Sequence, residues 1–349
     1  MRSLLSAITV LFFISCGKKE SAIVPRKIVK VEIESLFQDS LLSIRAIEIL
    51  EDNNLAFAAN NSSYGMMNSV TKEWKISKKN IDTFNVNFRA VAHTKEDFLM
   101  LGIASPTYLF KTTMSGMKLS YSEDHPKAFY DAMDFWNDME GIAMGDPTGN
   151  CISIIITRDG GNSWNKISCE NLPKSIDGEA AFAASDSNIA IVGDHTWIAT
   201  GGNASRVMYS ADKGQTWEVF ETPIIQGTGT TGMYSIDFYD ELNGFAIGGD
   251  YTKPKDNSAN KIRTVDGGKT WDIVGANQNP DYRSCVQFIP NREGKELVVV
   301  GFNGIDYSND SGSTWTHLSD EGFYTLRFID EHTAYAAGKG RISKLTFKE

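Results

Sequence analysis

The sequence lacks most of the devices that stabilise very small or membrane-spanning proteins. It has only 4 cysteines in 349 residues, too few for a fold built on disulfides. Beyond residues 4–14, no segment is apolar enough to enter a bilayer, and that run is shorter than the roughly 20 residues of a transmembrane helix. The fold must therefore rest on a buried core, for which a hydrophobic content of 41% is sufficient.

Clusters that would bind nucleic acid, metal or a dinucleotide are also missing. The net charge is −10 with a pI near 5.1, and no basic run occurs in the body, which argues against a nucleic-acid partner. The histidines show no spacing typical of metal ligands, and the glycines of residues 227–232 do not lie between a strand and a helix. We therefore expect neither a metal site nor a cofactor. The histidines are His93, His125, His195, His317 and His332.

The N-terminus carries an export signal. Arg2 precedes the apolar run, and the letters FISC that end at Cys16 resemble the lipobox of bacterial lipoproteins. That resemblance implies removal of residues 1–15 and lipidation of Cys16; the alternative is an ordinary cleaved secretory signal. Residues 16–26 are polar and predict a tether, and residues 27–349 predict a single folded body. We expect the protein in the cell envelope, lipid-anchored on the periplasmic or cell-surface side.

One octapeptide occurs four times. Its copies are TRDGGNSW (157–164), SADKGQTW (210–217), TVDGGKTW (264–271) and SNDSGSTW (308–315). The four tryptophans are 53, 54 and 44 residues apart, a period typical of propeller blades or solenoid repeats. Two partial copies of the octapeptide, at residues 112–119 and 68–74, lie at about the same spacing along the chain.

A second repeated phrase precedes these turns and raises the count to seven. Each copy is followed by a polar turn and a small apolar run, so each unit predicts four antiparallel strands. Such sheets bury both faces when they close radially, which predicts an all-β, seven-bladed β-propeller. The last unit is one strand short, so we expect the N-terminal strand, residues 27–35, to complete it. The phrases lie at residues 44–49, 88–93, 130–135, 179–184, 234–238, 282–288 and 324–328.

The octapeptide resembles the Asp box, or bacterial neuraminidase repeat. In such a turn the aspartate accepts hydrogen bonds from backbone amides, the glycine supplies a positive φ, and the tryptophan packs between blades. We therefore interpret Asp159, Asp212, Asp266 and Asp310 as structural. The order of phrases is similar to that of the photosystem II stability/assembly factor family and, more distantly, to sialidases and sortilin-type receptors. This resemblance implies the propeller fold far more firmly than it implies an activity.

The aligned phrases predict a ring of polar residues around one mouth of the channel. The next residue is always small, so the strands crowd the axis and the preceding side chain leans over the mouth. Arginines there would hold an anionic group of a ligand; the alternative is that the ring charges pair with one another. The ring comprises Arg45, Arg89, Asp131, Glu179, Tyr234, Arg283 and Tyr324, with Asp146, Asp194 and Asp250 beside it and Trp197 and Tyr251 on flanking loops.

We therefore predict a membrane-anchored, extracytoplasmic scaffold that binds a protein partner or a glycan at this mouth. The alternative is a sialidase-like glycoside hydrolase, because Glu179 and Tyr234 are residue types that such an enzyme uses. The sialidase Arg-Ile-Pro signature is absent, and no catalytic residue is assigned. Cys151 and Cys169 flank the first octapeptide turn and either bridge two strands or stay reduced.

Overall fold

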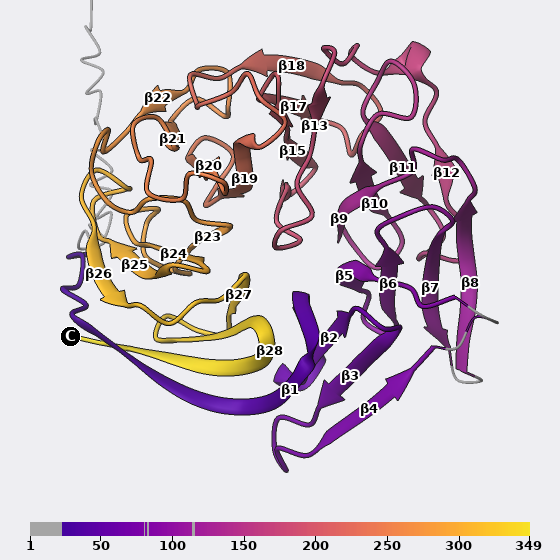
Figure 1. The fold of residues 1–349 in the computed structure, drawn as a ribbon, viewed down its shortest axis with the longest axis horizontal. Helices are drawn as coiled ribbons and strands as arrows, with labels where there is room; N and C mark the ends of the chain where they lie inside the picture. Colours follow the sequence, from indigo (N-terminus) through magenta and orange to yellow (C-terminus); the bar gives the residue numbers. More distant parts are fainter. Residues whose placement is uncertain (1–22, 80, 82–83, 114–115) are drawn as a thin grey trace, which may run out of the picture.

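The computed structural model describes residues 23–79, 81, 84–113 and 116–349. Strands dominate, and the two helical segments in this part are the single turns η1 (Glu51–Asn53) and η2 (Cys169–Asn171). Figure 1 shows the strands arranged in sheets around a central axis. None of the helical turns in the described ranges has the length and apolar character needed to cross a bilayer. The predicted signal segment and Cys16 lie outside the described residues.

Three regular blades and one extended sheet hold most of the strands. The first blade comprises β5 (Phe88–His93), β6 (Phe98–Gly102), β7 (Thr107–Thr113) and β8 (Gly116–Glu123). The second comprises β9 (Tyr130–Phe135), β10 (Gly141–Gly145), β11 (Ser153–Thr157) and β12 (Asn165–Lys166). The third comprises β23 (Cys285–Phe288), β24 (Leu297–Gly301), β25 (Gly304–Ser308) and β26 (Thr316–Ser319). The extended sheet joins β27 (Thr325–Phe328), β28 (Thr333–Lys348), β1 (Lys30–Ile49), β2 (Leu55–Ala59), β3 (Ser63–Met67) and β4 (Trp74–Lys78).

The remaining two sheets interlock. One comprises β14 (Ile189–Val192), β15 (His195–Ala199), β17 (Arg206–Ser210) and β18 (Glu218–Glu221). The other adds the short strands β13 (Glu179–Ala180) and β16 (Gly201–Gly202) to β19 (Thr231–Phe238), β20 (Gly244–Asp250), β21 (Lys261–Thr264) and β22 (Asp272–Ile273). Buried apolar clusters lie between neighbouring sheets, as Trp197 against Phe238 and Ile236 illustrates. The core is therefore a ring of interfaces between sheets.

The prediction of seven blades is wrong, because the described strands form six sheets. Strand β1 is 20 residues long and runs without a break from one expected blade into the next. Its first part pairs with β28, with Lys30 opposite Lys348, and its last part pairs with β2, with Ile49 opposite Leu55. The strands assigned to the first and the seventh blade therefore belong to one six-stranded sheet, which also closes the ring.

The octapeptide turns are cross-linked internally. In the first, Asp159 Oδ1 accepts a hydrogen bond from the Ser163 amide at 2.9 Å, and Oδ2 accepts one from the Ser163 hydroxyl at 2.6 Å. Asp212, Asp266 and Asp310 accept the equivalent pairs. Gly161 has a φ of 76°, and a Cβ added there would lie 2.5 Å from Leu99 of the neighbouring blade. Each turn thus presses glycine backbone against the preceding blade, where a larger residue would not fit.

Two further features were left open or predicted differently. Cys151 and Cys169 form a disulfide, and Cys285 is a buried free thiol. Residues 23–26, which we assigned to the tether, lie against the β23–β26 blade: Arg26 is 8% exposed and bonds to Glu296. The body therefore begins before Lys27.

Candidate functional site

The residues aligned at the predicted mouth occupy β-bulges. The antiparallel register shifts at Arg45 in β1, at Arg89 in β5, at Asp131 in β9 and at Tyr234 in β19. A bulge inserts one unpaired residue into a strand and redirects its side chain. The same irregularity in four innermost strands explains how these side chains reach the axis although the small residues after them are buried in the sheets.

The channel is not open, because residues 180–188 cross it. We refer to this segment as the plug. It begins at β13 and ends at β14, and Figure 1 shows it reaching the centre of the ring. The repeated phrase predicts an innermost strand at residues 179–184. That assignment is wrong: β14 is innermost, since β14 pairs with β15 and β15 pairs with β17.

Side chains and amides from several sheets hold the plug. Asp186 accepts hydrogen bonds from the amides of Val91 at 2.8 Å and Met133 at 3.1 Å. Its own φ is 55°, in the left-handed region that aspartate tolerates better than most residues. Asp146 accepts a hydrogen bond from the Ala181 amide at 2.8 Å, and Thr325 donates one to the Ser185 carbonyl at 2.8 Å. The plug is therefore held by strands of three different sheets.

Arg45 and Arg89 lie where the plug meets the mouth. Arg45 donates to the Ala184 carbonyl at 3.2 Å, and Arg89 donates to the Ala183 carbonyl at 3.0 Å. Neither guanidinium forms a salt bridge with a carboxylate of the described residues, and Arg45 Nε has no hydrogen-bond partner there. Burial and the charge of Arg45 lower the pKa of Arg89 to about 10, and burial also lowers the pKa of Arg45. The acidic group that acts on Arg89 is the buried Asp131, whose own pKa is raised by burial. A ligand anion would therefore stabilise the two guanidinium groups.

A pocket of about 680 Å³ opens above the plug and includes both arginines. One wall is a series of aromatic rings: Phe182 of the plug stacks on Tyr234 at 3.9 Å between centroids, and Tyr282 meets Tyr234 edge-on at 4.9 Å. Tyr251 and Phe302 extend this wall toward solvent and are 49% and 43% exposed. The pocket therefore combines apolar ring faces with two cationic groups.

A second hollow continues the pocket toward the edge of the disc. It has a volume of about 560 Å³, shares Asp146 and Ala180 with the pocket, and is otherwise lined mainly by polar residues such as Lys127 and Asn150. The two together form a path from the axis outward. Such a path suits an extended chain better than a compact small molecule.

The structure brings five of the predicted mouth residues to this pocket. Arg45, Arg89, Tyr234, Tyr324 and Asp146 line it, and Tyr251 does so from a flanking loop. Asp131 is fully buried next to the plug, and burial together with the charge of Asp146 raises its pKa well above the usual range. Burial raises the pKa of Asp146 to about 6. Asp250 is 4% exposed and accepts hydrogen bonds from the Thr252 amide and hydroxyl.

Four other predicted residues lie elsewhere or are engaged. Glu179 accepts hydrogen bonds from Arg206 at 3.1 and 2.6 Å, and Arg283 donates to Asp306 at 2.8 and 2.5 Å. Asp194 lies on the opposite rim, where its carbonyl accepts a hydrogen bond from the Lys213 amide of an octapeptide turn. Trp197 is fully buried and stacks on Phe238 at 3.7 Å. These residues belong to the framework, because strands distant in sequence supply their partners.

The hydrolase alternative depends on a tyrosine activated by a glutamate. The Tyr234 hydroxyl donates instead to the Thr230 carbonyl at 2.8 Å, while Glu179 is engaged with Arg206. Burial, reinforced by the charges of Tyr282, Tyr251 and Asp250, raises the pKa of Tyr234. A tyrosine in this state is a poor nucleophile. The geometry therefore favours binding over glycoside hydrolysis.

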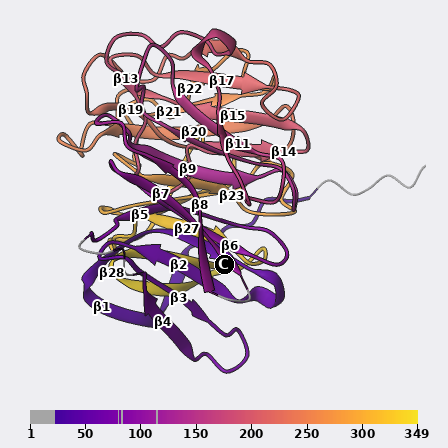
Figure 2. The ribbon, with the colours of Figure 1, turned by 90° about the vertical axis from the view of Figure 1, so that its right-hand side faces the viewer.

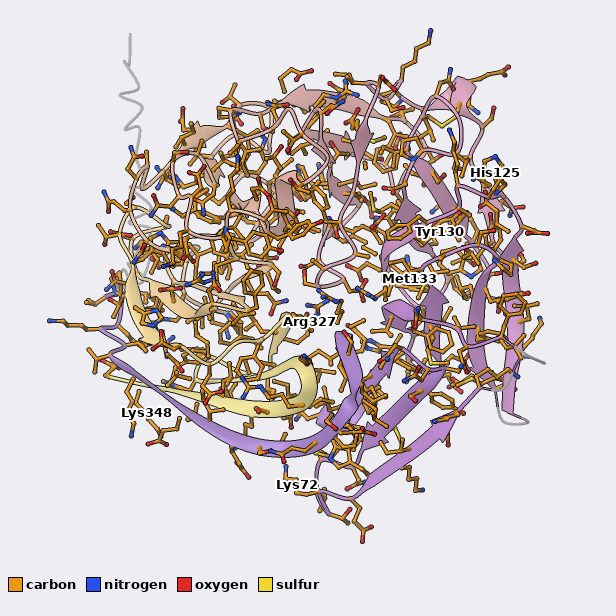
Figure 3. The ribbon with its side chains drawn as sticks, viewed as in Figure 1. Lys72, His125, Tyr130, Met133, Arg327 and Lys348 are labelled. Atoms are coloured by element: carbon orange, nitrogen blue, oxygen red, sulfur yellow. A yellow bond between two sulfur atoms is a disulfide. The ribbon has the colours of Figure 1, made fainter. Side chains whose placement is uncertain are left out.

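The other end of the channel holds a polar cavity that the sequence analysis missed. It has a volume of about 140 Å³ and lies on the far side of the plug, lined by Glu48, Asp134, Asp237 and Arg327 among others. Figure 3 shows Arg327 and Met133 near the centre of the ring. Each of these four charged residues lies three positions after a predicted mouth residue in the sequence. That spacing could have revealed them. In the part of the chain that the structure describes, no group of His, Cys, Asp and Glu side chains is arranged to hold a metal ion.

Comparison with known proteins supports the fold. No protein-family model matches the chain, and no curated protein matches its sequence. A solved structure of YCF48 bound to D1 peptide matches with a TM-score of 0.66 at 14% identity, covering 94% of this chain and 98% of the other. YCF48 from Cyanidioschyzon merolae matches with a TM-score of 0.65 at 12% identity, covering 90% and 98%. The WD40 repeats of RRP9 match at 0.64 and 10% identity, covering 92% and 99%. The chain is therefore an all-β propeller that resembles YCF48 and WD40-repeat propellers in fold.

Proposed function

We propose that this protein is a lipid-anchored extracytoplasmic scaffold that binds an anionic segment of a protein partner in the pocket above the plug. The observation that carries the proposal is the pair Arg45 and Arg89, which are half-buried beside the aromatic rings of the pocket and form no salt bridge among the described residues. A ligand carboxylate would supply the missing charge, and the aromatic wall would contact a neighbouring apolar side chain.

Two further observations support this function. Propellers of similar fold include one described as bound to a peptide, and the continuous path formed by the two hollows accommodates an extended chain. Location outside the cytoplasm is supported by the disulfide between Cys151 and Cys169, because such bonds persist in oxidising compartments. The lipid anchor is supported by the sequence that precedes Cys16.

The pocket is tested with a peptide array in which each sequence is present with a free C-terminal carboxylate and with an amide. We expect the native protein to prefer carboxylate peptides that carry an aromatic or aliphatic residue near the end. The double variant Arg45→Gln/Arg89→Gln should lose about tenfold or more in affinity, since a hydrogen bond to a charged group contributes about 1.5–3 kcal/mol. Arg263→Gln, on β21 and away from the pocket, is the matched control. Equal binding by the double variant and the control would show that the arginines do not hold the ligand.

The anchor is tested separately by cell fractionation. Cys16→Ser should move the protein from the membrane fraction to the soluble fraction, because the described body has no helix that could span a membrane. Unchanged fractionation would rule out lipidation at Cys16 as the means of attachment.

A further inference from the structure

The first described residues are fixed to one rim of the disc by a buried ion pair. Arg26 donates to Glu296 through Nε at 2.9 Å and through a terminal nitrogen at 2.7 Å, and its amide donates to the same carboxylate at 2.9 Å. The side chains of Arg26 and Glu296 are 8% and 0% exposed. The Arg26 carbonyl accepts hydrogen bonds from Tyr307 and Asn309. The chain is therefore held on both sides of this residue's backbone.

A second arginine holds the chain two residues earlier. Arg292 pairs with Glu296 at 2.8 Å and donates to the Val24 carbonyl at 3.0 Å. Burial by itself would raise the pKa of Glu296, but the hydrogen bonds from Arg26 and Arg292 lower it. This carboxylate therefore stays charged. Residues 24–26 are thus held to the disc by side chains of the folded body.

This attachment identifies the rim. Glu296 lies in the turn between β23 and β24, and Asn309 belongs to the octapeptide turn that follows β25. The octapeptide turns are at the end of the blades opposite to the mouth, so the N-terminal segment approaches from the face opposite to the pocket. Figure 2 shows the disc from its edge, with the described N-terminal end leaving on the right-hand side.

The same rim exposes several large apolar side chains. Met139, Leu242 and Val265 are 54%, 56% and 62% exposed. The Met139 carbonyl accepts a hydrogen bond from Gly160, and the Leu242 carbonyl accepts one from Gly267, so both tips lie beside octapeptide turns. Val265 is itself a residue of such a turn. Apolar side chains at the tips of turns on one face are typical of surfaces that contact a partner or a lipid bilayer.

We propose that this rim lies on the membrane surface, with Met139, Leu242 and Val265 at the lipid interface and the pocket directed away from it. The proposal rests on the anchor assigned to Cys16 under the proposed function. Six residues lie between Cys16 and Ile23, and the seven steps from one to the other span at most about 25 Å. To turn the mouth toward the membrane, the chain would use about 20 Å of that length to cross a six-residue strand. The apolar tips would then face water.

This orientation has a consequence for binding. A partner that reaches the pocket would approach from the aqueous side and would not have to pass between the disc and the bilayer. The attachment through Arg26 would then act as a positioning device, because it fixes the point on the disc from which the chain leads to the membrane.

The orientation is tested with full-length lipidated protein in vesicles of phosphatidylethanolamine and phosphatidylglycerol. A fluorophore is attached at Val265→Cys on the rim or at Tyr251→Cys beside the pocket, and spin-labelled lipids serve as quenchers. We expect quenching at position 265 to exceed that at position 251 by about threefold or more, as contact with the interface requires. Arg26→Gln should bring this ratio toward one without releasing the protein, whereas Lys27→Gln, its exposed neighbour, should not change it.

Three outcomes would overturn the proposal. Quenching at 251 that equals or exceeds quenching at 265 would mean that the pocket faces the lipid. A bound protein with no quenching at either position would mean that the rim does not touch the bilayer. Absence of the protein from the vesicles would refute the anchor and this orientation together, while peptide binding by the same protein in solution would still report on the pocket independently.

Discussion

Arg45 lies over the ring of Tyr324, with its guanidinium carbon 3.9 Å from the ring centroid. Arg45 comes from β1 and Tyr324 immediately precedes β27, so the contact joins the two ends of the chain where the ring closes. The ring also provides one of the few favourable interactions available to this arginine, since no carboxylate of the described residues pairs with it. The contact that joins the two ends of the chain therefore also holds one of the two arginines of the pocket.

Replacement of Tyr324 tests this relationship. Tyr324→Leu should reduce the free energy of unfolding by about 1–2 kcal/mol, because it removes a cation–π contact from a partly desolvated site. Tyr324→Phe should stay close to the native value, since the ring face is retained. Urea denaturation measures both variants. If leucine and phenylalanine gave equal stability, the stacking would contribute nothing.

The plug depends on Asp186. Asp186→Ala leaves the buried amides of Val91 and Met133 without an acceptor and places alanine at a φ of 55°. Each orphaned amide costs about 1–3 kcal/mol, so we expect a loss of about 2–6 kcal/mol in the free energy of unfolding. Asp177→Ala, an exposed change just before the plug, is the control. A similar stability for both variants would mean that the plug is not held through Asp186.

The disulfide should contribute to stability in an oxidising medium. Its cysteines are 18 residues apart, and closing a loop of that size is expected to contribute about 3 kcal/mol. The variant Cys151→Ser/Cys169→Ser should unfold at a correspondingly lower urea concentration and should not respond to dithiothreitol, whereas the native protein should. If dithiothreitol destabilised both proteins equally, the difference in stability between them would not come from this disulfide.

The repeat pattern was enough to predict the class of fold and several members of the site. Strand-forming phrases and octapeptide turns recur at a nearly constant step, and the pairing of Ala46 in an innermost strand with Ala58 in the next strand follows from it. The bulge positions Arg45, Arg89 and Tyr234 could be aligned because a small residue always follows them. Local patterns of this kind depend only on neighbouring residues, so a single sequence reveals them.

The errors arose where the outcome depends on distant partners. Residues 179–184 have the small, apolar composition of an innermost strand, yet they pass into the plug because β14 occupies that place in the sheet. Glu179 and Arg283 looked available for a ligand until Arg206 and Asp306 came beside them through folding. Whether β1 continues through two blades or breaks between them is decided by hydrogen bonds to β28 and β2, which no local pattern encodes.

The acidic residues on the far side of the plug make stability depend on pH. Burial raises the pKa of Asp134 to about 7, reinforced by the charge of Glu48, and burial raises the pKa of Asp237 to about 7 as well. Arg327 opposes both shifts, and Asp186 also faces this cavity. An acid with a higher pKa in the folded than in the unfolded chain binds an extra proton in the folded state between those two values. The stabilisation that these acids contribute to the folded state is therefore fully present below about pH 4 and is lost as the pH rises toward 7.

The octapeptide turns act in a different pH range, which keeps the two effects apart. Hydrogen bonds within the turns, working against burial, lower the pKa of Asp159, Asp212, Asp266 and Asp310, so their contribution is present above about pH 4 and is lost below it. A decline in the free energy of unfolding between about pH 4 and pH 7 therefore reports on the buried acids with raised pKa values, Asp146 of the pocket included, and a single substitution isolates the share of one cavity acid. Asp134→Asn, whose amide oxygen can still accept from the Phe135 amide, should flatten that decline by roughly 1–4 kcal/mol. Urea denaturation across this pH range measures the effect, with the exposed Asp124→Asn as control. If both variants kept the native dependence of unfolding free energy on pH, the assignment to Asp134 would be wrong.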